Sequence, residues 1–290
     1  MSKKGDKDHF VNQGYLRNFC DENLTTNKFH CWKAADGWNR KERGSSEVGY
    51  RYSFYNKQVD QELIKLLETK FGEVFKTKIQ NLKQLTGEER EWLALYTALM
   101  LLRTPTSRDR MDDFADKITK KAVNLYIKNV PPEIVEKESG MKQPEGWNIN
   151  NEKLKLTNEG FAQFMISPLS DFANILLRMN WTILRGDGNA RFITSDNPVV
   201  LEYHHFDHFH SLLVGAFFPL SPFFCLAITR PTEFDPPNNE LSYENALPLL
   251  PIINMQLVRF AREFLISSKE TFVRIEWLES KRKPKSDNQE

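Results

Sequence analysis

Cysteine is scarce in this chain, with three residues among 290. Cys20, Cys31 and Cys225 are an odd number without paired spacing, which argues against a disulfide-bonded secreted domain and favours a reducing compartment. The sequence has no run of about 18 or more apolar residues that would span a membrane, and its first residues lack the apolar core of a signal peptide. We therefore expect a soluble, cytoplasmic protein with no membrane partner.

An excess of charge of one sign is also absent, because 40 basic and 39 acidic residues give a net charge of +1. No overall field therefore recruits nucleic acid or an acidic membrane, and any such binding must be local. With 40% apolar residues the chain can bury a sizeable core. We predict a single domain over residues 1–279, with a helical lobe over about 1–179 and a sheet lobe over about 180–279. The polar residues 280–290 are predicted to be a disordered tail.

Recognised catalytic and metal-binding signatures are missing as well. The nucleophile pattern Gly-x-Ser-x-Gly does not occur. In an extended segment His204, His208 and His210 would share one face, but their spacing matches no familiar metal site, and neither does that of the cysteines. We predict no metal and no cofactor.

Apolar periodicity predicts helices in the first part of the chain. A long amphipathic helix is expected over Val59–Leu82, and Thr86-Gly-Glu-Glu89 has the pattern of a capping box at the start of a strongly apolar helix that Pro105 ends. Ser107 is the predicted cap of a further helix that runs to about Asn129. Its side chains predicted to point inward are Met111, Phe114, Ile118, Val123 and Tyr126.

A further helical region is predicted over Glu159–Met179, and strands dominate afterwards. Gly-Asp-Gly at residues 186–188 predicts a hairpin turn between strands at Trp181–Arg185 and Ala190–Thr194. The remaining predicted elements are strands at Phe217–Leu220, Phe223–Thr229 and Thr271–Trp277, and a helix at Pro248–Ile266. Helices that precede strands favour an α+β fold, a helix-rich N-terminal part packed on a C-terminal antiparallel sheet.

Four segments carry further recognisable motifs: Asp8–Phe19, Thr86–Arg90 with Arg103–Pro105, Phe192–Pro198 and Asn254–Ser267. Together they resemble the uncharacterised, mainly bacterial family catalogued as domain of unknown function 4238. Proteins similar to this chain usually carry a proline and an aromatic residue where it has Asn12 and Gly14. The resemblance supplies motif positions and implies no mechanism.

Three polar residues of the first segment would lie together on a helix over Val11–Phe19. His9, Gln13 and Arg17 are then on one side, opposite the apolar Val11 and Tyr15. Such a trio suits phosphate or other anion handling, since Arg17 can bind oxygens bidentately and His9 titrates near neutrality. The alternative interpretation is a solvated face.

Two charged residues stand within apolar patterns. Glu68 falls inside the apolar arc of its helix, and Arg103 is in register with Trp92, Tyr96 and Leu99. A buried charge requires a partner, so we predict that Glu68 and Arg103 pair inside the protein. The pair is either functional or architectural.

The segment Phe192–Pro198 ends a predicted strand in polar turn residues. Ser195, Asp196 and Asn197 could position a base, a metal or water, or could form an Asx-type turn that closes the strand. Asn254 interrupts an apolar helical stripe and is a further candidate. We predict one pocket, between the helical lobe and the sheet, that gathers these residues with those of the first segment.

Two functions remain open. The first is a hydrolase or phosphodiesterase-type enzyme acting on a nucleotide, a nucleic acid or another phosphate-containing substrate. In it His9, Glu68 and Asp196 are catalytic, and the substrate is bound by Gln13, Arg17, Arg103, Ser195, Asn197 and Asn254. The alternative is a ligand-sensing or interaction module in bacterial defence or stress response, which binds a small anion without turnover. A third interpretation makes these polar residues a structural network.

Overall fold

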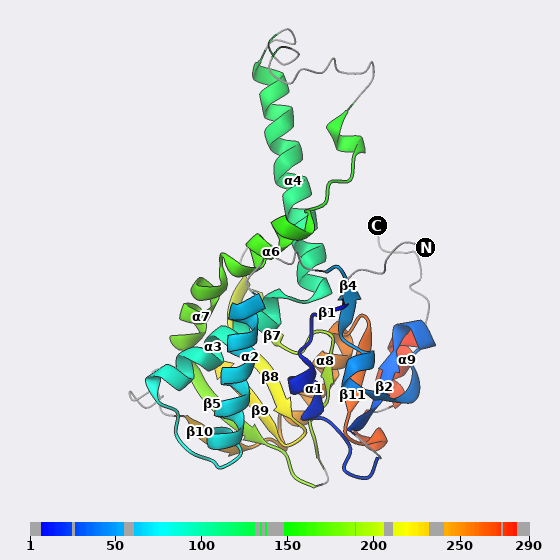
Figure 1. Ribbon diagram of the computed structural model, residues 1–290, viewed down its shortest axis with the longest axis vertical. Helices are drawn as coiled ribbons and strands as arrows, with labels where there is room; N and C mark the ends of the chain where they lie inside the picture. The colour runs from blue at the N-terminus through cyan, green and yellow to red at the C-terminus, as the bar shows by residue number, and fades with distance from the viewer. Residues whose placement is uncertain are drawn as a thin grey trace.

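The structure is a computed structural model. It describes residues 7–24, 27–54, 61–130, 148–188, 190–205, 211–231, 241–273 and 275–282, together with residues 134 and 137. The fold is α+β, as predicted, with most helices in the N-terminal part and most strands in the C-terminal half (Figure 1).

The helices begin with a short one beside the N-terminal strand and end close to the C-terminus. Their bounds are α1 Gln13–Arg17, α2 Gln61–Val74, α3 Gly87–Leu102, α4 Pro105–Asn129, α6 Asn158–Ile166, α7 Leu169–Leu177, α8 Leu250–Phe260 and α9 Ile275–Arg282. A π-helical turn, Phe75–Ile79, extends α2. The predicted capping box is confirmed, because Thr86 accepts from the N–H of Glu89 and the Glu89 carboxylate accepts from the N–H of Thr86.

The strands form three sheets. Their bounds are β1 Lys7–His9, β2 Lys28–Lys33, β3 Asn39–Gly44, β4 Tyr50–Tyr52, β5 Asn180–Arg185, β6 Thr194–Ser195, β7 Val200–His205, β8 Ser211–Ser221, β9 Phe224–Thr229, β10 Ser242–Asn245 and β11 Phe264–Ser267. β1 pairs with β4, a second sheet has the order β10-β5-β9-β8-β7, and a third has the order β3-β2-β11-β6. All pairings are antiparallel except that of β10 with β5, so the five-stranded sheet is mixed.

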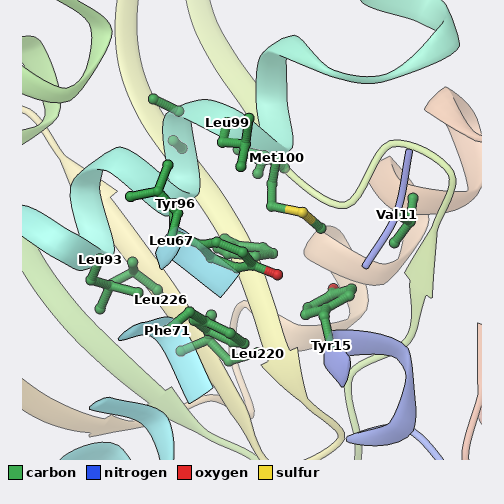
Figure 2. Close-up of a cluster of buried hydrophobic side chains, with 14 of the residues drawn as sticks. Val11, Tyr15, Leu67, Phe71, Leu93, Tyr96, Leu99, Met100, Leu220 and Leu226 are labelled. Atoms are coloured by element: carbon green, nitrogen blue, oxygen red, sulfur yellow. The ribbon is translucent and has the colours of Figure 1, made fainter. Parts of the chain in front are cut away.

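The five-stranded sheet separates two apolar cores. Along β9, Leu226 and Ile228 face the larger core under α2, α3 and α7, whereas Cys225 and Ala227 face a second core against α8 and β11. This alternation follows from the two-residue period of a strand. Figure 2 shows the larger core, where Tyr96 of α3 stacks on Phe71 of α2 with ring centroids 4.2 Å apart. α3 is buried along most of its length.

A predicted hairpin and a predicted helix in the second half of the chain are both wrong. The turn at Gly186–Gly188 does form, with Asp187 donating its N–H to the Ala190 carbonyl. The predicted hairpin does not, because β5 pairs with β9 and β10 while Thr194 continues into β6, which pairs with β11. Pro248–Ile266 is likewise not one helix, since α8 ends at Phe260 and β11 begins at Phe264.

The predicted strand at Thr271–Trp277 is also wrong. A 3-10 turn at Glu270–Phe272 leads into α9, which packs on the end of α8. Lys281 donates hydrogen bonds to the carbonyls of Arg259 and Ala261 at 2.7 Å each, so α9 completes the C-terminal end of α8. α9 reaches Arg282 and therefore includes the first residues of the predicted tail, whose residues 283–290 lie outside the described part.

Helix α4 differs from its predicted burial and cap. It projects away from the body of the molecule (Figure 1), and Phe114, Ile118 and Tyr126, predicted to point inward, are 56%, 52% and 41% exposed. Its cap is Thr104 rather than Ser107, since the Thr104 hydroxyl accepts from the N–H of Ser107. Apolar spacing marks one face of a helix but does not place another element against it.

Candidate functional site

The N-terminal motif is built around the short helix α1. Its cap is Asn12, whose side-chain oxygen accepts from the N–H of Tyr15 at 2.7 Å. A Cβ atom at position 14 would lie 2.8 Å from that oxygen, so Gly14 leaves room for the cap. The helix is shorter than the predicted Val11–Phe19, and His9 precedes it in β1.

His9 and Gln13 are nevertheless in contact, with the two Nε2 atoms 2.9 Å apart. Burial and the positive charges of Lys7 and Arg103 lower the pKa of His9 below its ordinary value of 6.5. The imidazole is therefore neutral at pH 7. Arg17, the third member of the predicted trio, is exposed on the last turn of α1.

Arg103 is the largest charged side chain in the core. It caps the C-terminal end of α3, is 1% exposed, and donates from Nη1 to Oε1 of Glu68 at 2.8 Å. The predicted contact is therefore confirmed. Its Nε also donates to the carbonyl of Phe10 at 2.7 Å, which fastens the N-terminal motif to α3. The guanidinium satisfies a carboxylate and a main-chain carbonyl from different segments of the chain.

The segment after β6 forms a closed polar turn. Ser195 donates from Oγ to the Asn197 carbonyl at 2.9 Å and accepts from the Asn197 N–H at 3.1 Å. The carboxylate of Asp196, which has no exposed surface, accepts from the main-chain N–H groups of Arg262 and Phe264. Burial nonetheless raises the pKa of Asp196 to about 6.

The two side-chain amides near this turn also bind main chain. Asn197 donates to the carboxylate of Asp196 at 3.0 Å and to the carbonyl of Phe260 at 2.9 Å. Asn254 accepts from the N–H of Ile193 at 3.1 Å and donates to the carbonyl of Arg191 at 2.9 Å. Together with the contacts of Asp196, these hydrogen bonds hold the residues on either side of β6 against α8 and β11.

The first, third and fourth motif segments converge through contacts that sequence reasoning missed. The Tyr15 hydroxyl lies 2.7 Å from Oγ1 of Thr194 and donates to the carbonyl of Pro219, also at 2.7 Å. The rings of Phe10 and Phe264 lie 6.4 Å apart. The sequence pattern predicts that Tyr15 lies on the apolar side of its segment. The pattern gives no sign that the hydroxyl of this tyrosine binds residues far along the chain.

A cavity of about 160 Å³ lies beside the polar turn after β6, since Asn197 of that turn contributes to its lining. Its polar wall contains Thr104, Thr106, Ser107, Arg110 and Asn197. The position between the first turn of α4 and the start of β7 agrees with a pocket between the helices and the sheet. Among the described residues, however, its lining includes Asn197 but not His9, Gln13 or Arg17. The N-terminal cluster and the cavity are thus separate features.

Within the described residues, no group of three or more histidine, cysteine, aspartate or glutamate side chains is arranged to hold a metal ion. The histidine-rich run is only partly included, because residues 206–210 lie outside the described ranges. The helices in the described part are all too short or too polar to cross a membrane.

The fold and these contacts define an α+β protein in which the buried guanidinium of Arg103, paired with Glu68, and the buried carboxylate of Asp196 fasten the terminal segments to the core. The chain belongs to the family described as "Protein of unknown function (DUF4238)", whose model matches residues 7–271. No curated protein and no solved structure matches the chain.

Proposed function

We propose that the protein is a hydrolase for a phosphate-containing substrate, a nucleotide or a nucleic acid, with His9 as the acid-base group. The observation that carries this proposal is the state of His9, a partly buried histidine whose pKa is lowered by burial and by Lys7 and Arg103. A neutral imidazole can accept a proton from an attacking water and return it to the leaving group.

The surroundings of His9 give the other groups their roles. Gln13, 2.9 Å away, fixes the ring in the absence of substrate. The charges of Lys7 and Arg103 act on the same imidazole and favour an anionic substrate beside it. Arg17 is exposed on α1, and its guanidinium can bind phosphate oxygens bidentately.

Glu68 is the carboxylate of the proposed site, because its charge acts on His9 and its side chain is 25% exposed. Ser195, Asp196, Asn197 and Asn254 hold main-chain groups in place. We therefore assign these four to positioning the polypeptide around the site rather than to contact with the reacting atoms.

The test is a turnover screen with p-nitrophenyl phosphate, bis(p-nitrophenyl) phosphate, nucleotides, RNA and single-stranded DNA. We expect wild type to hydrolyse at least one of them and His9→Ala to lower kcat/KM about 100-fold or more. Arg17→Gln should raise KM more than it lowers kcat. The matched control is Lys117→Gln on α4, which should leave both constants unchanged.

Thermal unfolding of each variant separates lost chemistry from lost structure. Full activity in a folded His9→Ala variant would refute the role of His9, and the absence of turnover on every substrate would refute the hydrolase. The second candidate is a ligand-sensing module in bacterial defence or stress response. The engagement of Asp196 and Asn254 with main chain favours it, since such groups build a rigid binding surface. It predicts nucleotide or nucleic-acid binding that His9→Ala weakens, without turnover.

A further inference from the structure

The cavity at the first turn of α4 has a wall suited to negative charge. α4 is a 25-residue helix that begins at Pro105, so its N-terminal end carries the positive end of a long helix dipole. Thr104 caps it through the N–H of Ser107. Thr106 and Arg110 both line the cavity and are four residues apart, hence on one face of the helix.

The second observation concerns Thr106. Its side chain is 9% exposed and lines the cavity, and its hydroxyl oxygen has no hydrogen-bond partner among the described residues. A buried hydroxyl without a partner is energetically costly. The unsatisfied donor and the guanidinium of Arg110 at the exposed side thus point to the same kind of group, an oxyanion.

The rest of the lining is apolar. It consists of Leu101, Val199, Val200, Leu201 and Phe260. The volume of about 160 Å³ is below the roughly 300–1,000 Å³ of pockets that bind drug-sized molecules. A cavity of about 150 Å³ holds a benzene ring in another protein. Both the size and the mixed polar and apolar lining therefore suit a small molecule with one charged end.

We propose that this cavity binds a small organic anion, with its carboxylate or phosphate group against Thr106 and Arg110 and its apolar part against Val199 and Phe260. The site is independent of the proposed hydrolase, because none of the residues assigned to acid-base work or phosphate binding there lines the cavity. The proposal thus stands or fails separately from turnover at His9.

The experiment is a binding titration of the full chain by isothermal calorimetry and by amide chemical shifts. The probes are benzoate, phenyl phosphate, benzyl alcohol and inorganic phosphate. We expect benzoate or phenyl phosphate to bind at least about tenfold more tightly than benzyl alcohol, which lacks the charge, and than inorganic phosphate, which lacks the ring. The stronger of the two aromatic anions identifies the preferred acidic group.

Three variants locate the binding. Arg110→Gln should weaken it by about tenfold or more, and Thr106→Val, which preserves the side-chain shape, should weaken it by a smaller factor. Lys117→Gln lies seven residues further along α4 and should have no effect. Equal affinity for benzoate and benzyl alcohol would overturn the anion site. Binding that neither Arg110→Gln nor Thr106→Val weakens, or no binding of any probe, would overturn the cavity as its location.

Discussion

Asp196 is a buried carboxylate held almost entirely by main-chain donors, and Asp196→Ala tests its energetic role. The wild-type side chain has no exposed surface and accepts from the N–H groups of Arg262 and Phe264 at 3.0 and 3.1 Å. The substitution leaves both donors unpartnered, which costs roughly 1–3 kcal/mol for each. It also removes a buried charge, and this second effect depends on pH.

The raised pKa of Asp196 determines the direction of that dependence. The folded value of about 6 lies about two units above the ordinary 3.8, so the folded protein binds the proton more tightly than the unfolded chain. A raised carboxyl pKa adds stability that is complete below about pH 4 and is lost as the pH rises through about 6. Two units correspond to about 3 kcal/mol. The stability of wild type relative to Asp196→Ala should therefore increase by up to about 3 kcal/mol from pH 7 to pH 4.

Urea unfolding of both proteins at several pH values measures this difference. Asp36→Ala is a control of opposite sign, because Lys41 and Arg43 hold the pKa of Asp36 below 3.8. Its effect should change little down to about pH 5 and then shrink in acid. If the effect of Asp196→Ala is constant or shrinks toward acid, the hydrogen bonds to Asp196 outweigh its burial, and the reasoning about its pKa is refuted.

Three further predictions concern the N-terminal motif. Lys7→Gln should raise the pKa of His9, because it removes a positive charge that lowers it, and the histidine's NMR titration measures the shift. Glu68→Ala should destabilise the fold by about 2–4 kcal/mol, since it leaves the buried Arg103 without its carboxylate, and a neutral result by urea unfolding contradicts the importance of the pair. Tyr15→Phe should cost about 1–3 kcal/mol through its lost hydroxyl contacts, and an unchanged denaturation midpoint excludes this.

The correct sequence predictions rest on local physical chemistry. The capping box of α3 needs only Thr86 and Glu89, three residues apart, and the structure forms it. The pairing of Glu68 with Arg103 was predictable because each charge interrupts an apolar helical stripe, and a charge in such a position needs a partner.

The missed and wrong predictions all concern segments whose structure depends on residues far away in the sequence. β2 and β3, at Lys28–Gly44, were not predicted, because β3 is polar and largely exposed and β2 gains its register from β11 near the other end of the chain. The same pairing explains why the predicted helix over Pro248–Ile266 is wrong at its C-terminal end, where β11 forms instead. Thr271–Trp277 was predicted to be a strand, yet among the described residues it pairs with no strand and instead forms the end of a 3-10 turn and the start of α9, which packs on α8.

The residues predicted for the candidate site also differ in the partners that they bind, and this difference bears on function. A polar residue in an apolar pattern announces that it has a partner, but the pattern does not distinguish main chain from ligand. Asp196 and Asn254 bind main chain, whereas His9 is only partly buried and Arg110 lines a cavity. Thr106, by contrast, gives no signal in the sequence, because a threonine in the first turn of a helix is commonplace. Its significance comes from an unsatisfied hydroxyl on a residue that lines the cavity between the first turn of α4 and the start of β7, and this arrangement depends on the tertiary fold.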